Sequence, residues 1–174
     1  ACEALKINWE PSQPGVSQTN AVAENNNSSI LDGARCGLVQ AGHPSCFWSW
    51  AGPCHCMLSN TAKYENGISP WYRRFGEEFK GQRIEYGRGV HFKPAPTKYR
   101  LAKADPRLQF GIFMGYRMAP GGRWNGEYIV LDVVDFVDRD LSYDAPHYEF
   151  NVHPHIVKIV YPTKTGPKFP IKEE

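Results

Sequence analysis

The sequence predicts an α+β fold, with helices in residues 1–80, a small antiparallel β-barrel in residues 81–161 and an extended tail in residues 162–174. Two observations support this order. Apolar residues before residue 60 recur at three- and four-residue intervals, as on one face of a helix. After Gly81 the chain changes to short runs of aromatic and β-branched residues, which glycine-rich turns separate. Helices should therefore precede strands along the chain.

The first helix is expected over residues 20–42. Asn20 is a suitable N-cap, and Gly42 followed by Pro44 is a strong stop signal. One face of this helix carries Ala23, Ile30, Ala34, Leu38 and Ala41.

Two further helices are expected before residue 80. The second begins after Pro44, and Pro53 within it predicts a kink or an early break, because proline lacks the N–H that a helix needs. The third is short and covers "SPWYRRFG", with Ser69 as the cap and Pro70 at the first helical position. The apolar face of the second helix carries Phe47, Ala51, Cys54 and Leu58.

The barrel strands are expected in "RIEYGRGVHFKP", "LQFGIFMGYRM" and "EYIVLDVVDFV". The loop "APGGRWNGE" joins the last two, and its Gly-Gly and Asn-Gly pairs favour tight turns. The tail "YPTKTGPKFPIKEE" is rich in proline and lysine, which predicts an extended segment. The expected barrel core comprises Ile84, Val90, Phe92, Ile112, Phe113, Tyr116, Tyr128, Val130 and Val133.

Composition narrows the function classes. The net charge is only +2, whereas nucleic-acid-binding proteins are usually strongly basic. Five cysteines form an odd count, which does not imply a closed disulfide framework. No apolar run is long enough to span a membrane, and no signal peptide is visible. An intracellular location, organelles included, is the expectation; any leader would precede Ala1, and no compartment is named.

Four segments occur in an order that carries a family resemblance. They are Pro14 with Asn20 to Glu24, "ARCGLVQAGHPSCFWSWA", "SPWYRRFGEEFKG" and "GIFMGYRMAPGGRW". Together they resemble the integrase region of copia-type retroelement polyproteins, in its divergent algal-protist form. The resemblance implies that the helical part is a remnant of a ribonuclease-H-like core and that the barrel is SH3-like.

The same resemblance implies that the catalytic machinery is incomplete. In that family the acid at the position of Glu24 works with two upstream aspartates to hold two divalent cations. None of the 23 residues before Glu24 is an aspartate. Residues 25–29 are three asparagines and two serines where relatives carry arginines that face DNA. Glu24 is therefore interpreted as a relic position in the first turn of a helix, and the protein is expected not to be an enzyme.

Two groups of side chains suggest metal binding and are given a structural interpretation instead. His43, Cys46, Cys54 and Cys56 lie close in sequence, but Cys54 and Cys56 are two residues apart and point about 200° from each other on a helix. The three cysteines are expected to be small buried thiols. His153 and His155 would share one side of an edge strand. No metal or cofactor is predicted.

A basic cluster is the candidate nucleic-acid site. Its aromatic neighbours, Phe92 and Tyr99, favour nucleic acid, whereas nearby glutamates favour a solvated loop or contact with an acidic protein. All three alternatives stay open. The cluster comprises Lys93, Lys98, Arg100, Lys103 and Arg107.

The leading hypothesis is a non-catalytic structural subunit of a larger assembly, such as a ribosome or an organellar, for example photosynthetic, membrane complex. It depends on helices for which the sequence predicts no partner sheet, because their apolar faces then need another protein or the edge of a membrane complex. The tail from Pro162 is expected to lie along such a partner. The rival hypotheses are a nucleic-acid-binding integrase remnant and a fragment of an active integrase. The predicted partner-binding residues are Ile30, Leu38, Phe47, Trp48, Trp50 and Leu58.

Overall fold

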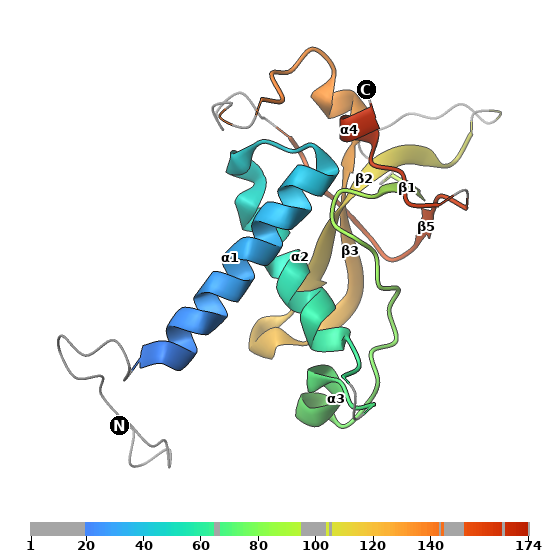
Figure 1. Cartoon of the computed structure of the whole chain (residues 1–174). Coiled ribbons are helices and arrows are strands. Elements are labelled where there is room, and N and C mark those ends of the chain that lie inside the picture. Colours follow the sequence, from blue (N-terminus) through green and yellow to red (C-terminus); the bar gives the residue numbers. More distant parts are fainter. Residues whose placement is uncertain are drawn as a thin grey trace.

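The computed structural model is an α+β fold in which helices precede an antiparallel sheet (Figure 1). Helix α2 lies between the long helix α1 and the sheet, and the short helix α3 lies beyond the end of α2. The structure describes residues 20–64, 67–94, 104, 106–142, 144, 152–164 and 166–173.

Helix α1 spans Ala21–Ala41 and ends where the sequence predicts. Gly42 adopts the left-handed conformation, with φ of 72°, and its N–H donates to the carbonyl of Leu38. Asn20 occupies the N-cap position, but its side chain makes no capping hydrogen bond. The buried residues of α1 all lie in its second half, at Ala34, Leu38 and Ala41.

Helix α2 spans Trp48–Thr61 and follows a short 3₁₀ turn, η2, at Ser45–Phe47. The early break expected at Pro53 does not occur, since the helix continues for two more turns beyond it. Burial of Ala51, Cys54 and Met57 offsets the lost backbone hydrogen bond. Helix α3 spans Pro70–Phe75, with Pro70 at its first position as predicted.

Caps fix both ends of α3. The hydroxyl of Ser69 accepts a hydrogen bond from the N–H of Tyr72 at 3.1 Å, which confirms the predicted N-cap. Gly76, with φ of 71°, ends the helix in the left-handed conformation.

Five antiparallel strands form one sheet in the order β4-β3-β2-β1-β5. The first two predicted strand segments contain β1 and β2. The third strand, β3, begins at Trp124, inside the predicted loop, and stops at Asp132, after which Val133–Phe136 form a 3₁₀ turn, η4. Asp132 causes this stop, because its carboxylate accepts the N–H of Val134 at 3.1 Å. The strands are β1 (Gly89–Phe92), β2 (Gln109–Met118), β3 (Trp124–Asp132), β4 (His155–Val157) and β5 (Val160–Pro162).

The two edge strands are adjacent in the chain, and this forces the sheet to curl. Four strand spacings would separate β4 from β5 by about 19 Å in a flat sheet. Only Lys158 and Ile159 join Val157 to Val160, so these two Cα atoms lie no more than about 11 Å apart. The pairings that the structure describes leave β4 and β5 at opposite edges, so the sheet is curled but is not closed by hydrogen bonds between them.

The predicted core of the sheet is largely confirmed. Eight of the nine residues are buried, and Val133 is half-buried against them. A register shift between Phe113 and Gly115 bends β2, and Gly115 has φ of 144°, which glycine tolerates. Gly115 also lies under α2, where an added Cβ would stand 3.5 Å from that of Cys54.

This packing corrects the view that the helices lack a sheet. Helix α2 covers the β2 face directly, and the buried residues of the helices and the sheet form one hydrophobic cluster. Sequence reasoning treated the helices as a remnant that had lost its original sheet. The sheet of residues 89–162 takes that place within the same chain.

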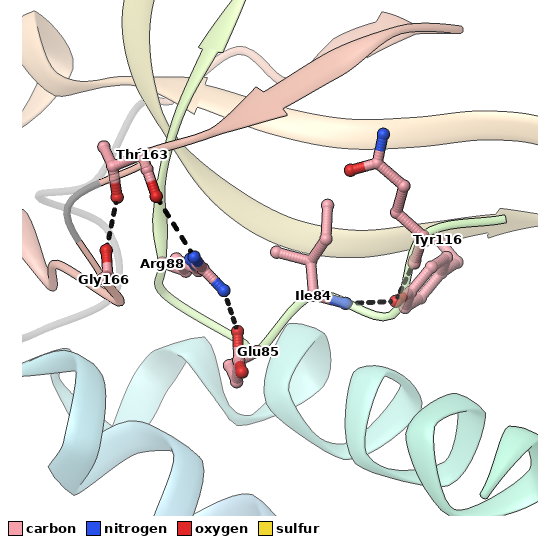
Figure 2. Close-up of polar contacts among 7 residues, drawn as sticks. Ile84, Glu85, Arg88, Tyr116, Thr163 and Gly166 are labelled. Carbon is pink, nitrogen blue, oxygen red and sulfur yellow. Dashed lines mark hydrogen bonds and ion pairs between the residues drawn. The ribbon is translucent and has the colours of Figure 1, made fainter.

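Two tyrosine hydroxyls of the sheet hold the linker between α3 and β1, and Figure 2 shows that of Tyr116. The other belongs to Tyr128 and accepts the N–H of Gln82 at 2.9 Å. The Tyr116 hydroxyl accepts the N–H of Ile84 and donates to the carbonyl of Gln82, both at 2.9 Å. Further along the linker, the Arg88 guanidinium pairs with Glu85 at 2.9 Å and donates to the carbonyl of Thr163 at 3.3 Å. The C-terminal segment is thereby joined to the linker.

The prediction of an extended tail that lies along a partner is wrong for the described residues. Pro162 belongs to β5, and the N–H of Gly89 donates to the carbonyl of Lys168 at 2.8 Å. Helix α4 (Pro170–Glu173) then packs beside the C-terminal end of α1, where Ile171 is buried. The buried Ile171 and the hydrogen bonds to the carbonyls of Thr163 and Lys168 together hold the segment to the body of the protein.

A candidate docking surface on the first two helices

The first half of α1 presents apolar side chains to solvent. Every residue from 22 to 32 is exposed, while the helix continues past the area that α2 covers. Ile30 is 38% exposed and Leu31 is 49% exposed. Large apolar side chains left in water on a rigid helix are candidates for contact with another protein.

Small residues bring α1 and α2 close together. An added Cβ at Gly33 would meet the imidazole ring of His55 at 2.2 Å, so this position leaves no room for a side chain without displacing the ring. Ala34, the next residue along α1, is also buried. The close approach leaves an open groove on each side of the helix pair.

The first of these grooves, termed the Trp48 groove, has a volume of about 390 Å³. Trp48 is 63% exposed at its edge, and Arg35 contributes a polar rim through its ion pair with Asp32 at 2.9 Å. An apolar centre with a charged rim is the usual anatomy of a protein interface. The groove is lined by Leu31, Ala34, Arg35, Leu38, Ser45, Cys46 and Trp48.

The six predicted partner-binding residues divide into three groups. Ile30 and Trp48 are exposed, as a docking role requires. Trp50 and Leu58 are half-buried against the core.

Leu38 and Phe47 are each only 3% exposed and belong to the core of this chain, although Leu38 forms the floor of the Trp48 groove. As surface anchors they were wrongly predicted. Helical periodicity marks an apolar face but does not say which part of it α2 and the sheet cover.

Sequence reasoning missed Leu31 and Arg35. Leu31 lies three residues before Ala34 and seven before Leu38, so the same spacing rule that selected those two could have included it. Arg35 had no such signal, because its position at the groove depends on where η2 and Trp48 pack.

The second groove, on the other side of the helix pair, has a volume of about 330 Å³. Gly33, Gly37 and His55 line it together with Leu58 and Tyr86. Its edge includes Glu85, which already pairs with Arg88. Both grooves therefore have an ion-paired charge at the edge, and the Trp48 groove differs by its exposed tryptophan.

Glu24 lies in the first turn of α1 and is exposed. This is the solvated helix-start position predicted for it, where a carboxylate favours the helix dipole. Within the described ranges, no three side chains of the His, Cys, Asp and Glu types converge as a metal site would require.

The basic cluster is only partly described. Lys93 directly follows β1 and Arg107 precedes β2, and both are exposed. Because Phe92 pairs with Gln109, these two cations flank the same end of the β1–β2 hairpin. Lys98, Arg100 and Lys103 lie outside the described residues.

The histidine and cysteine side chains near the start of α2 have structural roles. The Nδ1 atom of His43 hydrogen-bonds the Tyr86 hydroxyl at 2.8 Å, and burial lowers the pKa of His43 to about 4. Burial raises the pKa of the Cys54 thiol to about 12, with smaller contributions from Cys56 and Glu85. A thiol that stays protonated at neutral pH is a poor nucleophile. The prediction of small buried thiols is confirmed for Cys54, whereas Cys46 and Cys56 are only half-buried.

The two C-terminal histidines occupy different environments. His155, at the start of edge strand β4, is buried and its ring lies 5.0 Å from that of Phe92. His153 precedes the strand and is exposed. The expected edge-strand role applies to His155 alone.

Comparisons with known proteins identify no family: no family model, curated protein or solved structure matches this chain. Among the helices of the described residues, none is both long and apolar enough to cross a membrane.

Proposed function

We propose that this protein is a non-catalytic, retroelement-integrase-derived subunit of a larger assembly, and that it binds a partner protein through the Trp48 groove. The main support for this proposal is Trp48, which is 63% exposed beside an apolar groove on the first two helices. Buried tryptophans dominate the energetics of many interfaces. Covering a side chain of this size contributes roughly 1.5–3 kcal/mol.

The curled sheet supports the ancestry part of the proposal. Five short antiparallel strands, a long bent β2–β3 hairpin and edge strands that two residues join are features of a small SH3-like barrel. We infer that the sheet descends from such a barrel. Within the described residues, the integrase-like segments fall on α1, η2, α2, α3 and β2 and on the stretches that follow α3 and β2.

The non-catalytic part rests on Glu24 and its surroundings. Its carboxylate is exposed at the start of α1, and residues 25–29 are neutral and polar. One carboxylate does not hold the two cations of a phosphoryl-transfer site. Metal-dependent strand transfer by the chain that disappears in Glu24→Gln would contradict this assignment, and a purified species well above 19.7 kDa would favour a fragment of a longer integrase.

Photo-crosslinking in the native cell tests the docking surface. Replacing Trp48 by p-benzoylphenylalanine is expected to attach one recurrent protein in near-stoichiometric yield. The same replacement at Tyr161, an exposed residue on edge strand β5, provides the control and is expected to attach none. A chain that elutes from native extracts as a 19.7 kDa monomer, with no product at Trp48, would overturn the proposal.

The second candidate function is nucleic-acid binding at the β1–β2 hairpin. Lys93 and Arg107 flank the end at which the connecting segment joins β1 to β2, next to the paired residues Phe92 and Gln109. Retention on DNA that falls steeply with salt, and falls further in Lys93→Gln, would favour this function. Retention on DNA that does not depend on salt would argue against nucleic-acid binding and would leave partner docking as the only proposed function.

A further inference from the structure

A separate cavity lies at the other end of α2 from Trp48, where α2, α3 and the β2–β3 turn meet (Figure 1). Its volume is about 150 Å³, the size of an engineered cavity that binds benzene. It can therefore hold one large apolar side chain. The residues that matter for its chemistry are Met57, Trp71, Phe75, Met118, Asn60 and Arg74.

Arg74 is held at this cavity from two sides. Its Nη2 donates to the carbonyl of Gly121 at 2.8 Å, and its guanidinium carbon lies 5.3 Å from the ring centre of Phe75. Within the described part of the chain, no carboxylate pairs with it. A guanidinium fixed in this way keeps donors for a carboxylate, which it binds through two parallel hydrogen bonds.

Glu77, three residues after Arg74, already has cationic partners. It pairs with Lys80 at 2.9 Å and also with Arg123, and these two cations lower the pKa of its carboxyl group. Arg123 approaches the ring of Phe75 as well, at 5.7 Å. Arg74 is exposed to solvent, and its guanidinium can accept a carboxylate from a ligand.

The β2–β3 turn lies beside the exposed guanidinium of Arg74. Gly122 in this turn has φ of 75°, a backbone conformation that favours glycine. An added Cβ there would stand 3.6 Å from both terminal nitrogens of Arg74, which is ordinary van der Waals contact.

We propose that this cavity binds the carboxyl terminus of a partner polypeptide. The last side chain, large and apolar, enters the space above Met57 and Trp71, and the terminal carboxylate pairs with Arg74. Asn60 on the wall supplies an amide donor for the same carboxylate. A terminal residue suits the site because one Cα carries both groups, whereas an internal aspartate needs a neighbour to fill the cavity. The proposal is independent of the Trp48 groove.

Titration of the full chain with two matched peptides tests this proposal. Both are octapeptides that end in phenylalanine, one as the free acid and one as the amide. Binding is measured by NMR of the isotope-labelled protein. The free acid is expected to bind at least tenfold more tightly, with shifts confined to the surroundings of Trp71, Phe75 and Met118. Equal binding of the acid and the amide, or no binding of the acid, would overturn it.

Two substitutions identify the carboxylate receptor. Arg74→Gln is expected to lose at least tenfold in affinity for the free acid, while Arg73→Gln, the same charge change on the exposed adjacent residue, leaves affinity unchanged. Asn60→Asp, at an exposed position, is expected to weaken binding, because it places a carboxylate in the wall of the cavity. If Arg74→Gln fails to fold, this variant tests whether the carboxylate of the peptide binds there. Equal losses of affinity in both arginine variants would mean that only net charge matters, and would reject the site. An amidated peptide with an internal aspartate that binds as tightly as the free acid would also reject it.

Discussion

At the scale of single residues, His43 is the side chain whose surroundings have the clearest consequence. Its ring is buried, stacks on Phe136 with an interplanar angle of 3° and hydrogen-bonds Tyr86. Burial lowers its pKa from 6.5 to about 4, so the folded protein prefers the neutral ring. The resulting stability is fully present above pH 6.5 and is lost as the pH falls toward 4. We expect this histidine to account for about 3 kcal/mol of the loss in unfolding free energy between pH 7 and pH 4.

Urea unfolding at several pH values measures this contribution. His43→Gln is expected to be less stable at pH 7, because the stacked ring is lost, yet to depend less on pH between 6.5 and 4. His153→Gln removes an exposed histidine and is expected to retain the full pH dependence. Equal pH slopes for the wild type and His43→Gln would show that the ring does not titrate in this way.

At the scale of elements, α4 determines how the C-terminal segment is held. Ile171 is its buried residue, packed beside the end of α1, and Gly42 approaches the backbone of Lys172 there. We expect Ile171→Ala to lower the unfolding free energy by about 2 kcal/mol, near the small end of the range for isoleucine truncation, because the site is at the surface of the core. Lys172→Ala, at an exposed neighbour, is expected to change it by less than about 0.5 kcal/mol. An unchanged denaturation midpoint for Ile171→Ala would indicate a tail that does not pack in solution.

At the scale of the whole molecule, the helices and the sheet share one hydrophobic cluster. Cys54 on α2 lies over Gly115 on β2, so neither layer buries its apolar face without the other. We expect one cooperative unfolding transition, in which the far-ultraviolet circular dichroism and tryptophan fluorescence change at the same denaturant concentration. Residues 81–174 expressed alone are expected not to fold. Two separate transitions, or a folded 81–174 fragment, would instead support a division into independent domains near residue 80.

The sequence by itself determined the local structure. Gly42 and Gly76 end their helices in the left-handed conformation, Ser69 caps α3, and the Gly-Gly pair lies in the β2–β3 turn. The Asn-Gly pair, also predicted as a turn signal, lies within β3. Each of these features depends on a few neighbouring residues, so the signal is contained in a short stretch of chain. The basic residues Lys93 and Arg107 were likewise placed correctly at the surface.

Only the tertiary structure decided which apolar faces are covered. Leu38 and Trp48 look equally suited to an interface in sequence, yet Leu38 packs in the core and Trp48 remains exposed. The sequence predicted that Ile171 is part of an extended tail, whereas in the structure it is buried. Burial is settled by contacts between segments far apart in the chain, here α2 on β2 and α4 on α1, and no local pattern encodes which segments meet. The cavity at Arg74 arises in the same way, from three elements that only the folded chain brings together.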